Sequence, residues 1–192
     1  MDEEPDALHG PRIVPGTYQA KLTVDGKELT RPLIVTMDPR SVATSAELQQ
    51  QYELGRRMFA EAIRSRRALA QLHSLQEKLA ALADQLSAQP TELKTSLSQA
   101  QDSIRKTLTG SGARSGNAMG LELAHSGITS ALRVVESGNR TVPSQALAVF
   151  EESDGAAKLL IREWNQMKAN LLPRLNNELK QANQPPLSID EN

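Results

Sequence analysis

The sequence lacks cysteine, has few aromatic residues and carries almost no net charge. Without cysteine the chain cannot form a disulfide, a thiolate zinc site, an iron–sulfur cluster or a cysteine nucleophile. Two Tyr, two Phe and one Trp among 192 residues argue against an aromatic-lined ligand pocket or a sugar-stacking platform. The formal net charge of −1 argues against a general nucleic-acid binder, which would be strongly basic. We therefore expect no nucleic acid among its partners.

Long apolar runs are also missing. No stretch approaches the ~18–20 apolar residues of a membrane span, so we expect no membrane insertion. The first ten residues, MDEEPDALHG, are acidic and lack the basic start and apolar core of a signal peptide. We expect this sequence to carry no signal peptide, and residues 1–10 to be a disordered or added tail.

Residues 11–40 are predicted to form a β-hairpin. Apolar and polar residues alternate along positions 18–24, which is the pattern of a strand with one buried face. Asp25-Gly26 follows as a strong hairpin-turn signal, and Pro32 marks the return strand as an edge strand or a bulge. Because a lone hairpin is marginal in water, either the helices or further strands of a longer parent cover its apolar face. We favour the longer parent.

Residues 41–183 are predicted to form an elongated, antiparallel four-helix up-down-up-down bundle. They are rich in good helix formers, and leucines in the first helix repeat at steps of three and four, a heptad seam. Thr44 and Glu47 have the spacing of a capping box. The predicted fold class is therefore mainly α with a small N-terminal hairpin. The predicted helices span residues 45–87, 91–109, 117–137 and 143–183, before a C-terminal tail over residues 184–192.

The predicted helix lengths suggest a stalk. Some 43 residues at ~1.5 Å each make a first helix of about 64 Å, much longer than the second and third helices. Residues 45–65 and 165–183 are therefore expected to project as an antiparallel two-helix stalk. We expect the hairpin to cap this stalk with residues 187–189 close by, and Pro173 to kink the last helix.

Five arginines in the first helix form the candidate interaction surface. They are Arg56, Arg57, Arg64, Arg66 and Arg67. Such a cluster can bind anions or nucleic acid. However, Glu53 and Glu61 lie at helical spacings that allow pairing, the arginines spread over more than one face, and no aromatic residues interleave. We favour a solvated face; the anion-binding alternative predicts a steep salt dependence.

No constellation of residues predicts catalysis, a metal site or a cofactor. The three histidines are His9, His73 and His125. They are scattered, and none has a second histidine or acidic ligands at a metal-binding spacing. The glycine-rich segment 110–116 follows a helix and lacks the Gly-Lys-Ser/Thr ending, so we expect a flexible loop. The acidic run 151–154 is interpreted as a first helical turn, and Trp164 as a core residue. We expect this segment not to be an enzyme, and to have no catalytic, cofactor-binding or metal-binding residues.

Both ends of the chain resemble a known family. Four short segments carry the resemblance. They are Pro15-Gly16-Thr17-Tyr18 and Met37-Asp38-Pro39-Arg40 near the N-terminus, and Leu172-Pro173-Arg174 and Gln184-Pro185-Pro186-Leu187 near the C-terminus. They are similar to the C-terminal region of large bacterial secreted proteins with sortilin-like, neuraminidase-type propeller repeats, which are often labelled glycosyl hydrolases. The resemblance brackets residues 10–189. It implies an immunoglobulin-like sheet of which the hairpin is the end, and a secreted or periplasmic parent.

Three functional hypotheses follow. The leading one is a non-catalytic C-terminal accessory module that acts as a structural spacer or protein-interaction domain. Its partner is the rest of the parent protein, the propeller, and a homodimer is compatible with the same surfaces. The first alternative is part of a glycosyl hydrolase whose activity resides in the propeller, because the repeat motif Ser-x-Asp-x-Gly-x-Thr-Trp does not occur here. The second alternative is anion or nucleic-acid binding through Arg56–Arg67.

Overall fold

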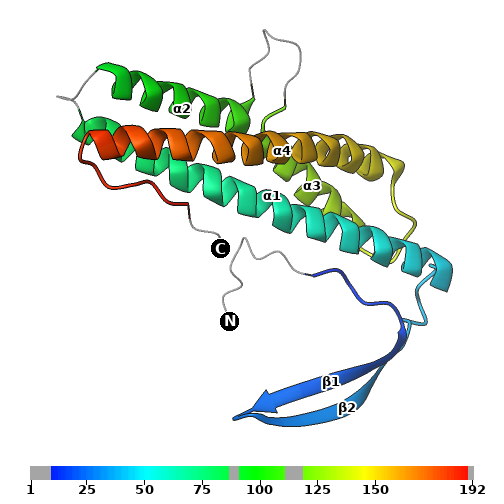
Figure 1. Ribbon diagram of the computed structural model, residues 1–192. Coiled ribbons are helices and arrows are strands. Elements are labelled where there is room, and N and C mark those ends of the chain that lie inside the picture. Colours follow the sequence, from blue (N-terminus) through cyan, green and yellow to red (C-terminus); the bar gives the residue numbers. More distant parts are fainter. Residues whose placement is uncertain (1–9, 87–90, 111–118, 190–192) are drawn as a thin grey trace.

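The computed structural model describes residues 10–86, 91–110 and 119–189, and it is mainly helical with a small hairpin, as predicted. The predicted features within residues 1–9, 87–90 and 111–118 lie outside the described residues. The elements, shown in Figure 1, are β1 (Gly16–Val24), β2 (Lys27–Val35), α1 (Ser45–Gln85), α2 (Thr91–Thr109), α3 (Leu121–Val135) and α4 (Ser144–Gln181).

The hairpin forms around the predicted turn. Asp25 and Gly26 have φ angles of 49° and 75°, the positive values that a type I′ turn requires at both central positions. The antiparallel register opposes Tyr18 to Leu33 and Leu22 to Leu29, so these apolar side chains share one face. The predicted hairpin and its turn are therefore confirmed, whereas the predicted buried face is not.

The apolar face of the hairpin is uncovered. Leu22 and Leu33 are 60% and 48% exposed, and within the described residues neither strand packs on a helix. Figure 1 shows the hairpin projecting away from the helices, joined to them through the segment before α1. The expectation that it caps a helical stalk is wrong, because the chain turns away from the helices at residues 36–44.

The helices pack as three rods, which differs from the predicted up-down-up-down order. α1 and α4 run parallel, since Arg57 contacts Asp154 near one end of the pair and Gln71 contacts Trp164 further along. α3 runs antiparallel to α1, since Gln51 contacts Val135 and, further along α1, Ser65 contacts His125. α2 and α3 follow one another in the same direction and together make one rod, the middle rod in chain order (Figure 1).

The predicted two-helix stalk is absent for the same reason. The 19 residues of α2 and the 15 of α3, placed end to end, cover most of the 41-residue length of α1. Residues 45–65 therefore pack on α3 and the start of α4. At the opposite end, Asn176 bonds both backbone groups of Leu187, and Lys78 donates to the carbonyl of Ser188 at 2.7 Å. The C-terminal segment thus lies far from the hairpin, contrary to expectation.

A close backbone contact joins the two halves of the middle rod. Gly110, with a φ of 83°, ends α2 and pairs with Met119 as an isolated bridge. Gly120 caps α3 and lies directly against the backbone of residues 108–110, where an added Cβ would overlap the Leu108 carbonyl. Only glycine permits this contact, which holds the start of α3 against the end of α2.

The core follows the predicted stripes. The heptad leucines of α1 are all buried, and they are Leu72, Leu75, Leu79, Leu82 and Leu86. Trp164 is fully buried and its Nε1 donates to Gln71 Oε1 at 3.1 Å. The predicted capping box is also present, since Thr44 and Glu47 exchange both hydrogen bonds at the start of α1. Local periodicity therefore predicts which side chains are buried in each helix.

Candidate functional site

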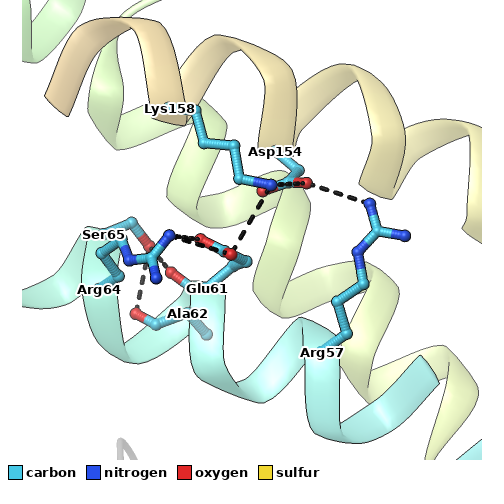
Figure 2. Close-up of polar contacts among 7 residues, drawn as sticks. All are labelled: Arg57, Glu61, Ala62, Arg64, Ser65, Asp154 and Lys158. Atoms are coloured by element: carbon cyan, nitrogen blue, oxygen red, sulfur yellow. Dashed lines mark hydrogen bonds and ion pairs between the residues drawn. The ribbon is translucent and has the colours of Figure 1, made fainter. Parts of the chain in front are cut away.

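A cluster of charged side chains lies between α1 and α4 and is called the α1–α4 seam here. It consists of Arg57, Glu61 and Arg64 from α1 with Asp154 and Lys158 from α4, and Figure 2 shows them facing one another. Asp154 Oδ2 accepts from Lys158 Nζ at 2.8 Å and from Arg57 Nη2 at 3.3 Å. Glu61 accepts two bonds from Arg64 Nη1 at 3.0 and 3.1 Å. Lys158 also lies 3.7 Å from Glu61, which links the two helices.

Helical spacing and packing together build the seam. Asp154 and Lys158 are one turn apart at i,i+4, and Glu61 and Arg64 pair at i,i+3. The parallel packing of α1 on α4 brings Arg57 opposite Asp154. The Arg57 guanidinium also lies 5.0 Å from the centre of the Phe150 ring, where the aromatic face attracts a cation.

The two signs of charge lie at different depths. The Asp154 side chain is 5% exposed and that of Glu61 is 13% exposed, whereas about half of each cationic side chain is accessible to solvent. Asp154 Oδ1 is buried with no hydrogen-bond partner among the described residues. The seam therefore presents cations outward above buried carboxylates.

The sequence interpretation of Asp154 as part of a first-turn acidic cluster is wrong. α4 begins at Ser144, which puts Asp154 in the helix interior, and there it is buried with Ser153 while Glu151 and Glu152 are exposed. The signal was a gap in the apolar stripe of α4, which steps from Phe150 directly to Ala157. A polar side chain at a core-facing position needs hydrogen-bond partners, and those of Asp154 are Lys158 on the same helix and Arg57 on α1.

The five predicted arginines do not gather on one surface. Arg57 and Arg64 belong to the α1–α4 seam, whereas Arg56 lies 5.7 Å from the centre of the Tyr52 ring. Arg66 acts electrostatically on a histidine of α3, and Arg67 is exposed. The structure thus divides the cluster between several faces, and it adds Lys158 to the two arginines at the seam.

A shallow groove adjoins the seam and is called the cationic groove here. Its volume is about 540 Å³, and its lining consists of Arg64, Lys158, Ile161, Arg162, Asn165, Gln166 and Ala169. A second, smaller cavity of about 280 Å³ lies where the segments flanking the hairpin meet α1, with Arg12, Tyr52 and Glu136 in its lining. Arg12 N donates to Glu136 Oε2 at 2.9 Å there, which ties the segment before β1 to the end of α3.

The described part of the chain offers neither a metal centre nor a membrane span. Across residues 10–86, 91–110 and 119–189, no three acidic or histidine side chains converge to hold a metal ion. Over the same ranges, no helix combines the length and the apolarity needed to cross a membrane. The arrangement of the α1–α4 seam and the cationic groove is suited to binding charged groups.

His125 provides a titratable contact between α1 and α3. Its Nδ1 lies 2.8 Å from Ser65 Oγ, and Ser65 is fully buried. Burial lowers the pKa of His125 below its ordinary value of 6.5, and the nearby charge of Arg66 lowers it further. The folded protein therefore favours the neutral imidazole.

We expect the free energy of unfolding to fall on acidification because of His125. Below pH 6.5 the unfolded chain binds a proton that the folded chain does not, so stability is complete above 6.5 and declines toward the lower folded pKa. Urea unfolding between pH 7.5 and 5 measures this slope. His125→Gln is expected to flatten it, with the exposed His73→Gln as the control. An unchanged slope in His125→Gln would contradict the assignment.

Known proteins give no further guide to the function. Comparisons with family models, curated proteins and solved structures find no match to this chain. The resemblance to the propeller proteins therefore stays a prediction. Function has to be argued from the hairpin, the seam and the groove.

Proposed function

We propose that this chain is a non-catalytic accessory module that docks through its hairpin onto a β-sheet of a larger protein. The observation that best supports this proposal is the uncovered apolar face of the hairpin, on which Leu22, Leu29 and Leu33 are each about half exposed. A two-stranded hairpin is marginally stable alone, so a partner that covers its apolar face stabilises the hairpin as it binds. The helical rods, some 60 Å long at the rise of an α-helix, serve as the spacer.

The register of the hairpin favours one edge for this docking. With a two-residue turn, Val24 and Lys27 form a hydrogen-bonded pair, and such pairs alternate along the ladder. Gln19 and Pro32 then form a pair without hydrogen bonds, so the proline nitrogen faces the outer edge of β2. That edge lacks a donor at its middle, whereas β1 presents an outward N–H at every second residue from Thr17 to Thr23. We infer that the partner strand adds beside β1.

The finer identity of the partner rests on the resemblance. The hairpin is proposed to complete an immunoglobulin-like sheet of a secreted or periplasmic bacterial protein that carries a propeller. A hydrolytic site within this chain itself would need two carboxylates across a cleft. The two carboxylates at the seam, Glu61 and Asp154, are instead buried and bound by Arg or Lys side chains. This supports a module without its own hydrolytic site.

Site-specific photo-crosslinking in the natural host tests the proposal. A photoreactive residue at Leu22, on the apolar face, is expected to give an adduct that mass spectrometry maps to a β-strand of the larger protein. The matched control carries the same residue at Thr23, on the opposite face of β1. Equal adducts at both positions, no adduct at Leu22, or an adduct only with a second copy of this chain would each contradict the proposal.

A further inference from the structure

We infer that the cationic groove between α1 and α4 binds an acidic segment of a partner protein. This inference is independent of the hairpin, because the groove lies on the helical rods. The groove follows α4 from Lys158 to Ala169, which is about 16 Å at the helical rise. That length accommodates three turns of a helix or about five extended residues. The groove is therefore large enough for a peptide segment.

The charge of the groove is not neutralised by its surroundings. Arg57, Arg64 and Lys158 share two carboxylates, those of Glu61 and Asp154, and Arg162 adds a further cation to the lining of the groove. Among the described residues no carboxylate forms an ion pair with Arg162, and only Nη1 of Arg64 bonds to Glu61. Guanidinium nitrogens therefore remain available to an incoming anion at both walls of the groove.

The buried carboxylates hold these cations in place. Glu61 anchors Arg64 from below with two bonds, and Asp154 anchors Lys158 at 2.8 Å. Cations fixed in this way lose less side-chain freedom when a ligand binds, which favours binding over a patch of mobile side chains. Neutralising Asp154 or Glu61 would therefore loosen the groove as well as change its charge.

The chemistry of the lining selects an acidic peptide. Arginine forks bind carboxylates through paired hydrogen bonds, and Arg162 and Lys158 are one helical turn apart on α4. Ile161 and Ala169 lie in the same groove and offer an apolar contact that a free inorganic anion would leave uncovered. Among the described residues, no aromatic side chain lines the groove, so this lining offers the bases of a nucleic acid no ring to stack on.

A peptide titration of the full chain tests the inference. The probe is a 12-residue peptide of Glu and Leu at helical spacing, followed by NMR at 50 mM NaCl. We expect shifts confined to the lining of the groove and contacts between peptide methyls and Ile161. Arg162→Ala is expected to weaken binding about tenfold, the effect of one charge-assisted hydrogen bond. Arg133→Ala, which removes an exposed arginine at the end of α3, is the matched control.

Other outcomes overturn the inference. One is that Arg162→Ala and Arg133→Ala weaken the binding of the Glu and Leu peptide equally. Another is that a Lys and Leu peptide binds as tightly as the Glu and Leu peptide. A third is that the Glu and Leu peptide does not bind at millimolar concentration. Inorganic phosphate or a single-stranded oligonucleotide that binds as tightly as the peptide, and loses as much affinity with Arg162→Ala, would assign the groove to that ligand instead. Raising NaCl from 50 to 200 mM must weaken the peptide complex, because exposed charges are screened.

Discussion

Replacing Trp164 with alanine is expected to lower the free energy of unfolding by about 3–5 kcal/mol. The side chain is fully buried and is the largest in the core. Its Nε1 donates to Gln71 Oε1, and the Lys168 ammonium lies 5.7 Å from its ring centre while bonding the same oxygen. Alanine therefore leaves a cavity at the contact between the parallel helices α1 and α4, and it removes one of the two donors to Gln71 Oε1.

Urea unfolding followed by circular dichroism measures this change, since Trp164→Ala removes the chain's one tryptophan and with it the fluorescence signal. Trp164→Phe keeps much of the volume but loses the hydrogen bond, so we expect a smaller loss than for alanine. Leu159→Ala, at an α4 position that is 57% exposed, is expected to change stability by less than about 0.5 kcal/mol. Equal losses in Trp164→Ala and Leu159→Ala would show that the tryptophan is not a core residue.

Gly120→Ala is expected to destabilise the protein by about 3 kcal/mol or more. The φ angle of Gly120 is −78°, which any residue adopts, so backbone strain is not the cause. The added Cβ would instead overlap the backbone at Leu108, Thr109 and Gly110, and none of these can move aside as a side-chain end can. The junction of α2 and α3 must then open.

The matched control for this change is Gly155→Ala. Gly155 lies in the interior of α4 with open space around the position of a Cβ, so alanine is expected to stabilise by about 0.5–1 kcal/mol. Thermal unfolding of both variants compares them directly. A Gly120→Ala variant that is as stable as the unsubstituted protein, or as stable as Gly155→Ala, would show that the contact between α2 and α3 does not limit stability.

The sequence predicts the parts of this fold that depend on near neighbours. Asp25-Gly26 fixes the hairpin turn, and the spacing of Leu72, Leu75 and Leu79 identifies the buried face of α1, because both signals lie within one element. The order of the rods depends instead on a contact between two helices, in which Gly120 at the start of α3 packs against the backbone at the end of α2. An apolar stripe says which face is buried, but it does not say along which half of α1 a short helix packs.

The candidate site is predictable to a similar degree. Arg57 and Arg64 are recognisable as charged residues on a helix that buries its other face. Asp154, the partner of Arg57, and the groove residue Arg162 lie about a hundred positions away in sequence, and only tertiary packing brings them to α1. The missing apolar residue in the stripe of α4 does indicate a buried polar side chain, but periodicity does not identify its partner.

The parallel arrangement of α1 and α4 has a kinetic consequence. Arg57 and Asp154 are 97 positions apart, whereas α3 and α4 are joined by the short connection 136–143 and pack along each other. Closing a long loop costs more chain entropy than closing a short one, and contacts between near neighbours in sequence form faster. We therefore expect α3 and α4 to pair early in folding, with α1 docking later. The ion pairs of the α1–α4 seam then act after the folding barrier, and they slow unfolding more than they speed folding.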